Sequence, residues 1–167
     1  MAIHQTIEPE PIHAPIRIGV IVSRYNPEVT ESLREAAVES FATRPGADPE
    51  DELVVMPAPG AYEVPAIAYA AIETESFDGL VALACVIKGE TRHDEVIAGA
   101  VVQGLTSLTV EFGMPIGLGV LTVDSLEQAR ARAGGEHGNK GAEAMNAVLG
   151  VLATVVAMEP SEAAEAE

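Results

Sequence analysis

Short apolar runs rich in β-branched residues alternate along the chain with longer segments whose apolar residues recur every three to four positions. Four runs have the length and composition of strands, at 18–22, 53–56, 80–87 and 116–121. The third is apolar on both faces, as in a central parallel strand covered by helices on either side. The helical periodicity predicts helices over 27–41, 64–74, 91–112, 125–133 and 140–158.

Local signals mark where several of these helices begin. Asn26 and Pro27 are a favoured N-cap and a favoured first helical residue. Thr91 is the expected cap of the third helix. Ser125 and Gln128 have the spacing of a capping box, and Gly134-Gly135 is expected to end the short helix that follows.

The alternation of strands and helices predicts one α/β domain over residues 16–158. We expect a flavodoxin-like three-layer sandwich, with a four-stranded parallel sheet and helices on both faces. Residues 1–15 contain Pro9, Pro11 and Pro15, which favour an extended arm, and 159–167 read as a disordered acidic tail. The helix at 140–158 is apolar nearly all round, so we expect it to be buried, in part at a subunit interface.

Charge narrows the range of partners. The 167 residues include nine Lys and Arg against 26 Asp and Glu, a formal net charge of −17. Nucleic acids and anionic membrane surfaces are bound through clustered basic side chains, so we expect neither partner. The run 144–158 is too short for a membrane span, and the N-terminus does not resemble a signal peptide. Cys85 is the single cysteine, which excludes an intrachain disulfide and favours a reduced, cytoplasmic setting.

In open parallel sheets, ligands bind beyond the carboxyl ends of the strands. The segments expected there are S-R-Y-N at 23–26, P-A-P-G-A-Y-E at 57–63, K-G-E-T-R-H at 88–93 and T-V-D-S at 122–125. Two of the three tyrosines, Tyr25 and Tyr62, fall in these loops. They could stack on a flat heterocycle, and they could equally be ordinary surface aromatics.

His93 is the strongest catalytic candidate, because imidazole exchanges protons readily near neutrality. A helix-surface histidine remains the alternative interpretation. Gly89-Glu90-Thr91 precedes a helix and could present N–H groups to an anion. A metal site is only weakly indicated, because no second histidine lies at ligand spacing. The run at 135–141 fails the P-loop spacing, and no G-x-G-x-x-G follows the first strand, so nucleotide sites are unsupported.

Five segments occur in the order and at the spacing of one enzyme family. They are R-Y-N at 24–26, P-G-A-Y-E-V-P at 59–65, C-V-I-K-G-E-T-R-H at 85–93, G-V-L-T-V-D-S-L-E-Q-A at 119–129 and R-A-G-G-E-H-G-N-K-G at 132–141. In these segments, between about residues 17 and 158, the chain resembles the lumazine synthases of riboflavin biosynthesis.

The resemblance implies a condensation of 5-amino-6-(D-ribitylamino)uracil with 3,4-dihydroxy-2-butanone 4-phosphate. The product would be 6,7-dimethyl-8-ribityllumazine, with loss of phosphate and water and without a metal or organic cofactor. It also implies sites between adjacent subunits of a homopentamer. Some members of the family assemble twelve pentamers into a 60-subunit shell, and the short segment from Arg132 to Lys140 is similar to theirs.

The resemblance assigns roles to individual residues. His93 would donate and accept protons. The pyrimidine substrate would meet Tyr25, Asn26, Ala61, Tyr62, Glu63, Cys85, Val86, Ile87 and Leu118. The phosphorylated substrate would meet Glu90, Thr91, Arg132 and Lys140.

Two positions depart from the family pattern. Leu118 stands where the family often has Phe, and Asp94 stands where many members have an aromatic residue. Leu118 would come from the neighbouring subunit and lose aromatic stacking, whereas Asp94 would place a carboxylate near His93. These departures leave a second interpretation open, a non-catalytic homologue that binds lumazine or flavin or forms a shell.

Overall fold

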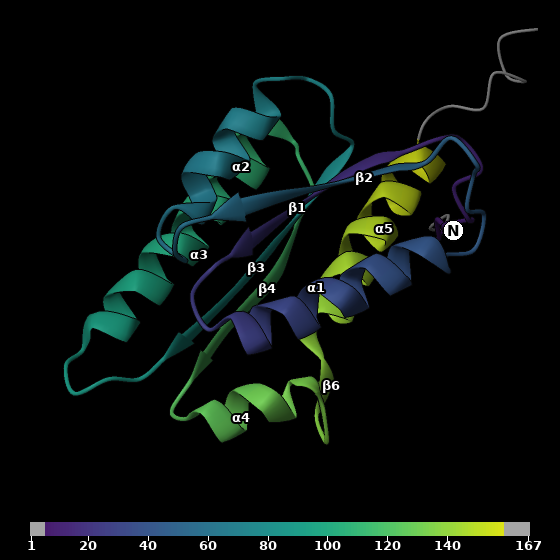
Figure 1. The fold of residues 1–167 in the computed structure, drawn as a ribbon. Helices are drawn as coiled ribbons and strands as arrows, with labels where there is room; N and C mark the ends of the chain where they lie inside the picture. Colours follow the sequence, from purple (N-terminus) through teal and green to yellow (C-terminus); the bar gives the residue numbers. More distant parts are fainter. Residues whose placement is uncertain (1–5, 159–167) are drawn as a thin grey trace, which may run out of the picture.

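A computed structural model describes residues 6–158 and shows four parallel strands between two layers of helices (Figure 1). The strand order across the sheet is β2-β1-β3-β4. Its strands are β1 (Arg17–Ser23), β2 (Glu52–Ala58), β3 (Gly79–Ile87) and β4 (Ile116–Val123). The helices are α1 (Pro27–Ala42), α2 (Val64–Ile72), α3 (His93–Phe112), α4 (Leu126–Ala131) and α5 (Lys140–Met158). The predicted flavodoxin-like α/β fold is confirmed, with small shifts at the ends of its elements.

Each face of the sheet has its own apolar core. On one face, α1 and α5 cover a cluster that includes Val20, Leu33 and Met145, all fully buried. On the other, α2 and α3 cover a cluster that includes Ile21 and Val101. Val20 and Ile21 are neighbours in β1, so the alternation of side chains along a strand supplies both cores.

Helix α5 approaches the rest of the domain backbone to backbone through glycines. A Cβ atom on Gly141 would overlap the carbonyl oxygen of Leu33, and one on Gly117 would overlap that of Ala144. The second half of α5 is different, because Val151 and Val155 remain exposed in the single chain. The single chain therefore buries the first half of α5, and the predicted contact of the remainder with another subunit stays a prediction.

Between α4 and α5 the chain forms a two-stranded ribbon that the sequence pattern does not predict. Helix α4 ends at Ala131, earlier than the glycine stop, and β5 (Ala133–Gly135) then pairs antiparallel with β6 (Gly138–Asn139). Gly134 and Gly138 have φ angles of 105° and 74°, which other residues rarely adopt. The two glycines thus shape a ribbon that lies beyond α4 (Figure 1).

Residues 6–15 contain no helix or strand, in agreement with an extended segment, while residues 1–5 and the predicted tail 159–167 lie outside the described residues. Ile12 and Ile16 are buried in the α1–α5 core. The Arg44 guanidinium donates a hydrogen bond of 2.7 Å to the carbonyl of Ile12. This guanidinium is held in turn by Asp51, so an internal ion pair fixes the segment onto the domain.

Helices α3 and α5 are long and apolar enough to cross a bilayer by length and composition alone. Core helices of soluble proteins pass the same test. Here both helices pack on the sheet, and α3 begins at the carboxyl end of the central strand β3.

Candidate active site

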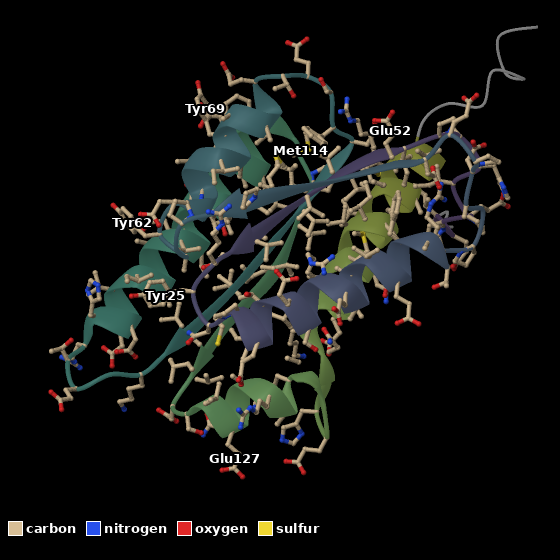
Figure 2. All side chains as sticks on the ribbon, in the orientation of Figure 1. Tyr25, Glu52, Tyr62, Tyr69, Met114 and Glu127 are labelled. Atoms are coloured by element: carbon tan, nitrogen blue, oxygen red, sulfur yellow. The ribbon has the colours of Figure 1, made fainter. Side chains whose placement is uncertain are left out.

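A cleft of about 740 Å³ lies at the carboxyl ends of β1, β2 and β3, next to the start of α3. Its volume is within the range of small-molecule sites. Figure 2 shows Tyr25 and Tyr62 on the same side of the molecule, whereas Glu127 marks α4 at the bottom of the view. The lining residues are Tyr25, Asn26, Gly60, Ala61, Tyr62, Glu63, Cys85, Val86, Ile87, Gly89, Thr91, His93, Asp94, Val96 and Ile97.

Asn26 ties the β1–α1 loop to the central strand. Its φ and ψ angles of 54° and 56° are left-handed, a conformation that asparagine tolerates better than most residues. Its side chain makes no cap bond to α1, in contrast to the prediction, and its Nδ2 donates 2.9 Å to the carbonyl of Cys85. Tyr25 therefore stands at the rim on a strained and anchored turn, with its side chain 72% exposed.

The β2–α2 loop forms a second wall. Ala61 is buried, whereas Tyr62 and Glu63 are exposed beside the cleft. A Cβ atom on Gly60 would lie 2.9 Å from a carboxylate oxygen of Glu63, so the glycine leaves the room that this carboxylate occupies. The wall thus offers an exposed ring and an acceptor of hydrogen bonds.

The end of β3 supplies the floor. Burial raises the pKa of the Cys85 thiol to about 11, so the thiol is protonated at neutral pH and is not a nucleophile. Val86 and Ile87 are half-buried and continue the strand to its last residue. What this segment presents to a ligand is main chain and apolar surface, as the resemblance implies.

His93 is the first residue of α3 and is exposed at the cleft. The N-cap is Arg92, which makes no side-chain cap bond, so the predicted Thr91 cap is wrong. Thr91 instead lines the cleft from the loop. Uncapped N–H groups at a helix start attract anions, and here they adjoin the imidazole.

The sequence pattern does not predict the burial of Asp94, which lines the cleft. It is buried, and its Oδ1 atom has no hydrogen-bond partner. Within residues 6–158, no ion pair joins it to His93, because consecutive helical residues point in different directions. The available signal was its spacing from Ala98, Val101 and Leu105, which are buried on the same face of α3.

Four predicted site residues do not line the cleft of their own chain. Glu90 is exposed in the loop before α3, and Leu118 is 49% exposed on the edge strand β4. Arg132 follows α4 and donates to the carbonyl of Gln128, and Lys140 pairs with Glu143 at the start of α5. The fold thus separates the predicted residues into one set at the cleft and a second set near α4, β4 and the ribbon.

The charge of the cleft is unfavourable for a phosphate group. Glu63, Asp94 and His93 are its titratable residues besides Tyr25, Tyr62 and Cys85, and no lysine or arginine is among the residues that line it. The described residues also contain no group of three or more His, Cys, Asp or Glu arranged to hold a metal ion. An anionic ligand therefore needs cations from outside this wall.

Comparison with known proteins bears on this geometry. The sequence model of the family described as 6,7-dimethyl-8-ribityllumazine synthase matches residues 15–155. Among curated proteins, the 6,7-dimethyl-8-ribityllumazine synthase of Gemmatimonas aurantiaca is 45% identical over 136 residues. That alignment covers 81% of this chain and 82% of the relative.

Proposed function

The chain belongs to the 6,7-dimethyl-8-ribityllumazine synthase family, and from this membership we propose how its cleft performs the family reaction. The enzyme is a transferase of riboflavin biosynthesis. It condenses 5-amino-6-(D-ribitylamino)uracil with 3,4-dihydroxy-2-butanone 4-phosphate and releases 6,7-dimethyl-8-ribityllumazine, phosphate and water. The non-catalytic alternative is not favoured.

One observation carries the assignment of the site. Ten of the predicted residues, from the ends of three separate strands and the loops that follow them, line a single cleft, with His93 among them. They are Tyr25, Asn26, Ala61, Tyr62, Glu63, Cys85, Val86, Ile87, Thr91 and His93. Residues so far apart in the sequence meet because parallel strands all end at one edge of the sheet.

The chemistry of this wall suits the pyrimidine substrate. The exposed ring of Tyr25 offers a stacking surface, and the main chain of Cys85–Ile87 offers partners for the heterocycle's polar edge. Glu63, exposed at the same wall, would accept hydrogen bonds from ribityl hydroxyls. Imine formation, phosphate loss and ring closure then need proton transfers, for which His93 is the available group.

The phosphorylated substrate requires more than one subunit in this proposal. The cleft wall lacks lysine and arginine, and Arg132 lies outside it. We therefore assign the phosphate to the loop Gly89–Thr91 of one subunit together with Arg132 and Lys140 of its neighbour. Leu118 of the neighbour would cover the heterocycle.

Exposed apolar side chains support an assembly. Val96, Val110 and Phe112 of α3 are exposed, and the exposed half of α5 adds Val151 and Val155. Such surface is covered in most soluble proteins. We propose a homopentamer, with the 60-subunit shell as a further assembly whose stability depends on salt, because a charge of −17 per chain accumulates in a closed shell.

Turnover by the purified protein tests the function. We expect formation of a fluorescent lumazine from the two substrates, faster than in a control without protein and dependent on the butanone phosphate. Tight binding of the pyrimidine without any rate enhancement would contradict the enzyme assignment and support a binding or shell-forming role.

Arg132→Ala tests the phosphate site. We expect the KM for the butanone phosphate to rise about 10–100-fold, because a hydrogen bond between charged groups contributes about 1.5–3 kcal/mol. The KM for the pyrimidine should change little. The half-buried Arg34, which pairs with Glu31 on α1 and lies outside the residues that line the cleft, provides the control variant Arg34→Ala. An equal loss of affinity for both substrates would contradict the phosphate assignment.

Complementation tests whether the site is shared. Arg132→Ala and His93→Ala chains are co-expressed so that they form mixed assemblies. If each site takes His93 from one chain and Arg132 from the next, about a quarter of the sites in a random mixture contain both intact residues. Activity well above that of either variant is expected, whereas no recovery would place both residues in one subunit's site.

A further inference from the structure

Asp94 is a buried residue, and one of its two carboxylate oxygens has no hydrogen-bond partner in the described part of the chain. The residue is 9% exposed, and its Oδ1 atom is buried without a hydrogen-bond partner. No lysine, arginine or histidine among the described residues forms an ion pair with it. Buried carboxylates are almost always paired, so this one calls for a physical explanation.

The position of Asp94 on α3 brings it to the wall of the cleft. It begins the inward-facing stripe of α3, one turn before Ala98 and two turns before Val101, and it also lines the cleft. Ile97 and Val86, which line the same cleft, are apolar and cannot donate a hydrogen bond to it. The N-terminus of α3 favours a negative charge in its first turn, which helps to keep the carboxylate there without fixing a partner.

The two substrates differ in the groups that they can bring to the carboxylate of Asp94. The pyrimidine carries N–H donors on its ring and amino groups, whereas the butanone phosphate carries a negative charge that a carboxylate repels. Asp94 and Glu63 are both acidic, and the wall provides no lysine or arginine to offset them. The acceptor is therefore matched to the neutral substrate that is rich in donors.

We propose that Asp94 is a specificity-determining residue whose carboxylate, at the wall of the cleft, accepts a hydrogen bond from an N–H group of the pyrimidine substrate. This inference rests on the proposed function, because it takes the pyrimidine as the occupant of the cleft. It assigns binding to Asp94 and leaves proton transfer to His93.

Asp94→Asn tests the proposal, because it keeps the shape of the side chain and removes its charge. We expect the dissociation constant of the pyrimidine alone, measured by calorimetry, to rise about tenfold, as for a hydrogen bond to a charged acceptor. The KM for the butanone phosphate should stay within about twofold, because that substrate makes no hydrogen bond to the carboxylate. Glu111→Gln, at the exposed far end of α3, is the matched control and should bind as the unmodified protein does.

The binding measurement does not depend on turnover, so the two proposals can fail separately. If the unmodified protein makes no lumazine but Asp94→Asn still weakens pyrimidine binding, the enzymatic function fails and the role of Asp94 stands. If turnover is normal and Asp94→Asn binds the pyrimidine as tightly as before, the role of Asp94 is overturned. A lower melting temperature with unchanged binding would likewise overturn it, since the residue would then be structural only.

Discussion

Replacing Asp51 with alanine is expected to lower the free energy of unfolding by about 3–5 kcal/mol, the usual cost of removing one partner of a buried ion pair. The guanidinium of Arg44 and the carboxylate of Asp51 lie 2.8 Å apart, with side chains 3% and 9% exposed. Without Asp51, the charge of Arg44 would stay buried and uncompensated. Chemical denaturation followed by circular dichroism, at one fixed protein concentration, measures the change.

Asp51 also connects three backbone segments. Its carboxylate accepts hydrogen bonds from the N–H groups of Ile16 and Asp48, and its partner Arg44 holds the carbonyl of Ile12. The alanine variant thus releases residues 6–16 from the domain as well as breaking an ion pair. Increased proteolysis in this segment is the expected second sign.

The same contacts make the stabilisation by the Arg44–Asp51 ion pair depend on pH. Burial by itself would raise the pKa of Asp51, but the hydrogen bonds from Arg44 and from the Asp48 and Ile16 N–H groups outweigh it, and the pKa lies below its usual 3.8. A lowered folded-state pKa means that the stabilisation is present above about pH 4 and is lost as the pH falls further. The difference in stability between unmodified protein and Asp51→Ala should therefore shrink in acid.

Glu52→Ala is the control for this prediction. Glu52 is the next residue along the chain and pairs with Arg17 at 3.0 Å, but both side chains are largely exposed. Exposed pairs contribute about 0–1 kcal/mol, so the expected change is small. Equal effects of the two substitutions would show that the buried pair has no special role.

How far the sequence determines the fold can be judged from particular elements. The apolar run of β3 and the periodicity of α1 and α5 locate these elements because burial selects one residue type at regular intervals. The β5–β6 ribbon is missed because it is short and depends on the positive φ angles of Gly134 and Gly138. The apolar pattern of α5 predicts a covered helix, but it does not say which part the same chain covers and which part stays exposed on the single subunit.

The features of the site likewise divide into those that the sequence predicts and those that it does not. The rule that ligands bind at strand ends, together with the resemblance, predicts Tyr25, Tyr62 and His93, all of which line the cleft. It does not predict that the side-chain amide of Asn26 donates to the carbonyl of Cys85 in place of capping α1. The sequence pattern shows only the local cap, whereas the competing acceptor lies 59 positions away along the chain. Arg132 and Leu118 cannot be placed relative to the cleft from one chain if they act across a subunit boundary.

His93→Ala is expected to lower kcat about a hundredfold, at the lower end of the usual contribution of acid–base catalysis. The substrates would still be held together in the cleft, and this proximity preserves part of the acceleration. Because His93 is exposed and makes no ion pair among the described residues, the variant should fold and assemble normally. Steady-state kinetics and light scattering measure the two quantities.

His137→Ala is the matched control, because His137 is also exposed but lies in the turn of the ribbon, outside the residues that line the cleft. It should retain nearly full activity. If His93 transfers protons, free imidazole in the buffer should restore part of the rate of His93→Ala, since the space left by the side chain opens directly to solvent. Imidazole should not affect the His137 variant. Unchanged turnover in His93→Ala would assign the proton transfers to water or to the substrates themselves, and the enzyme would then act by binding alone.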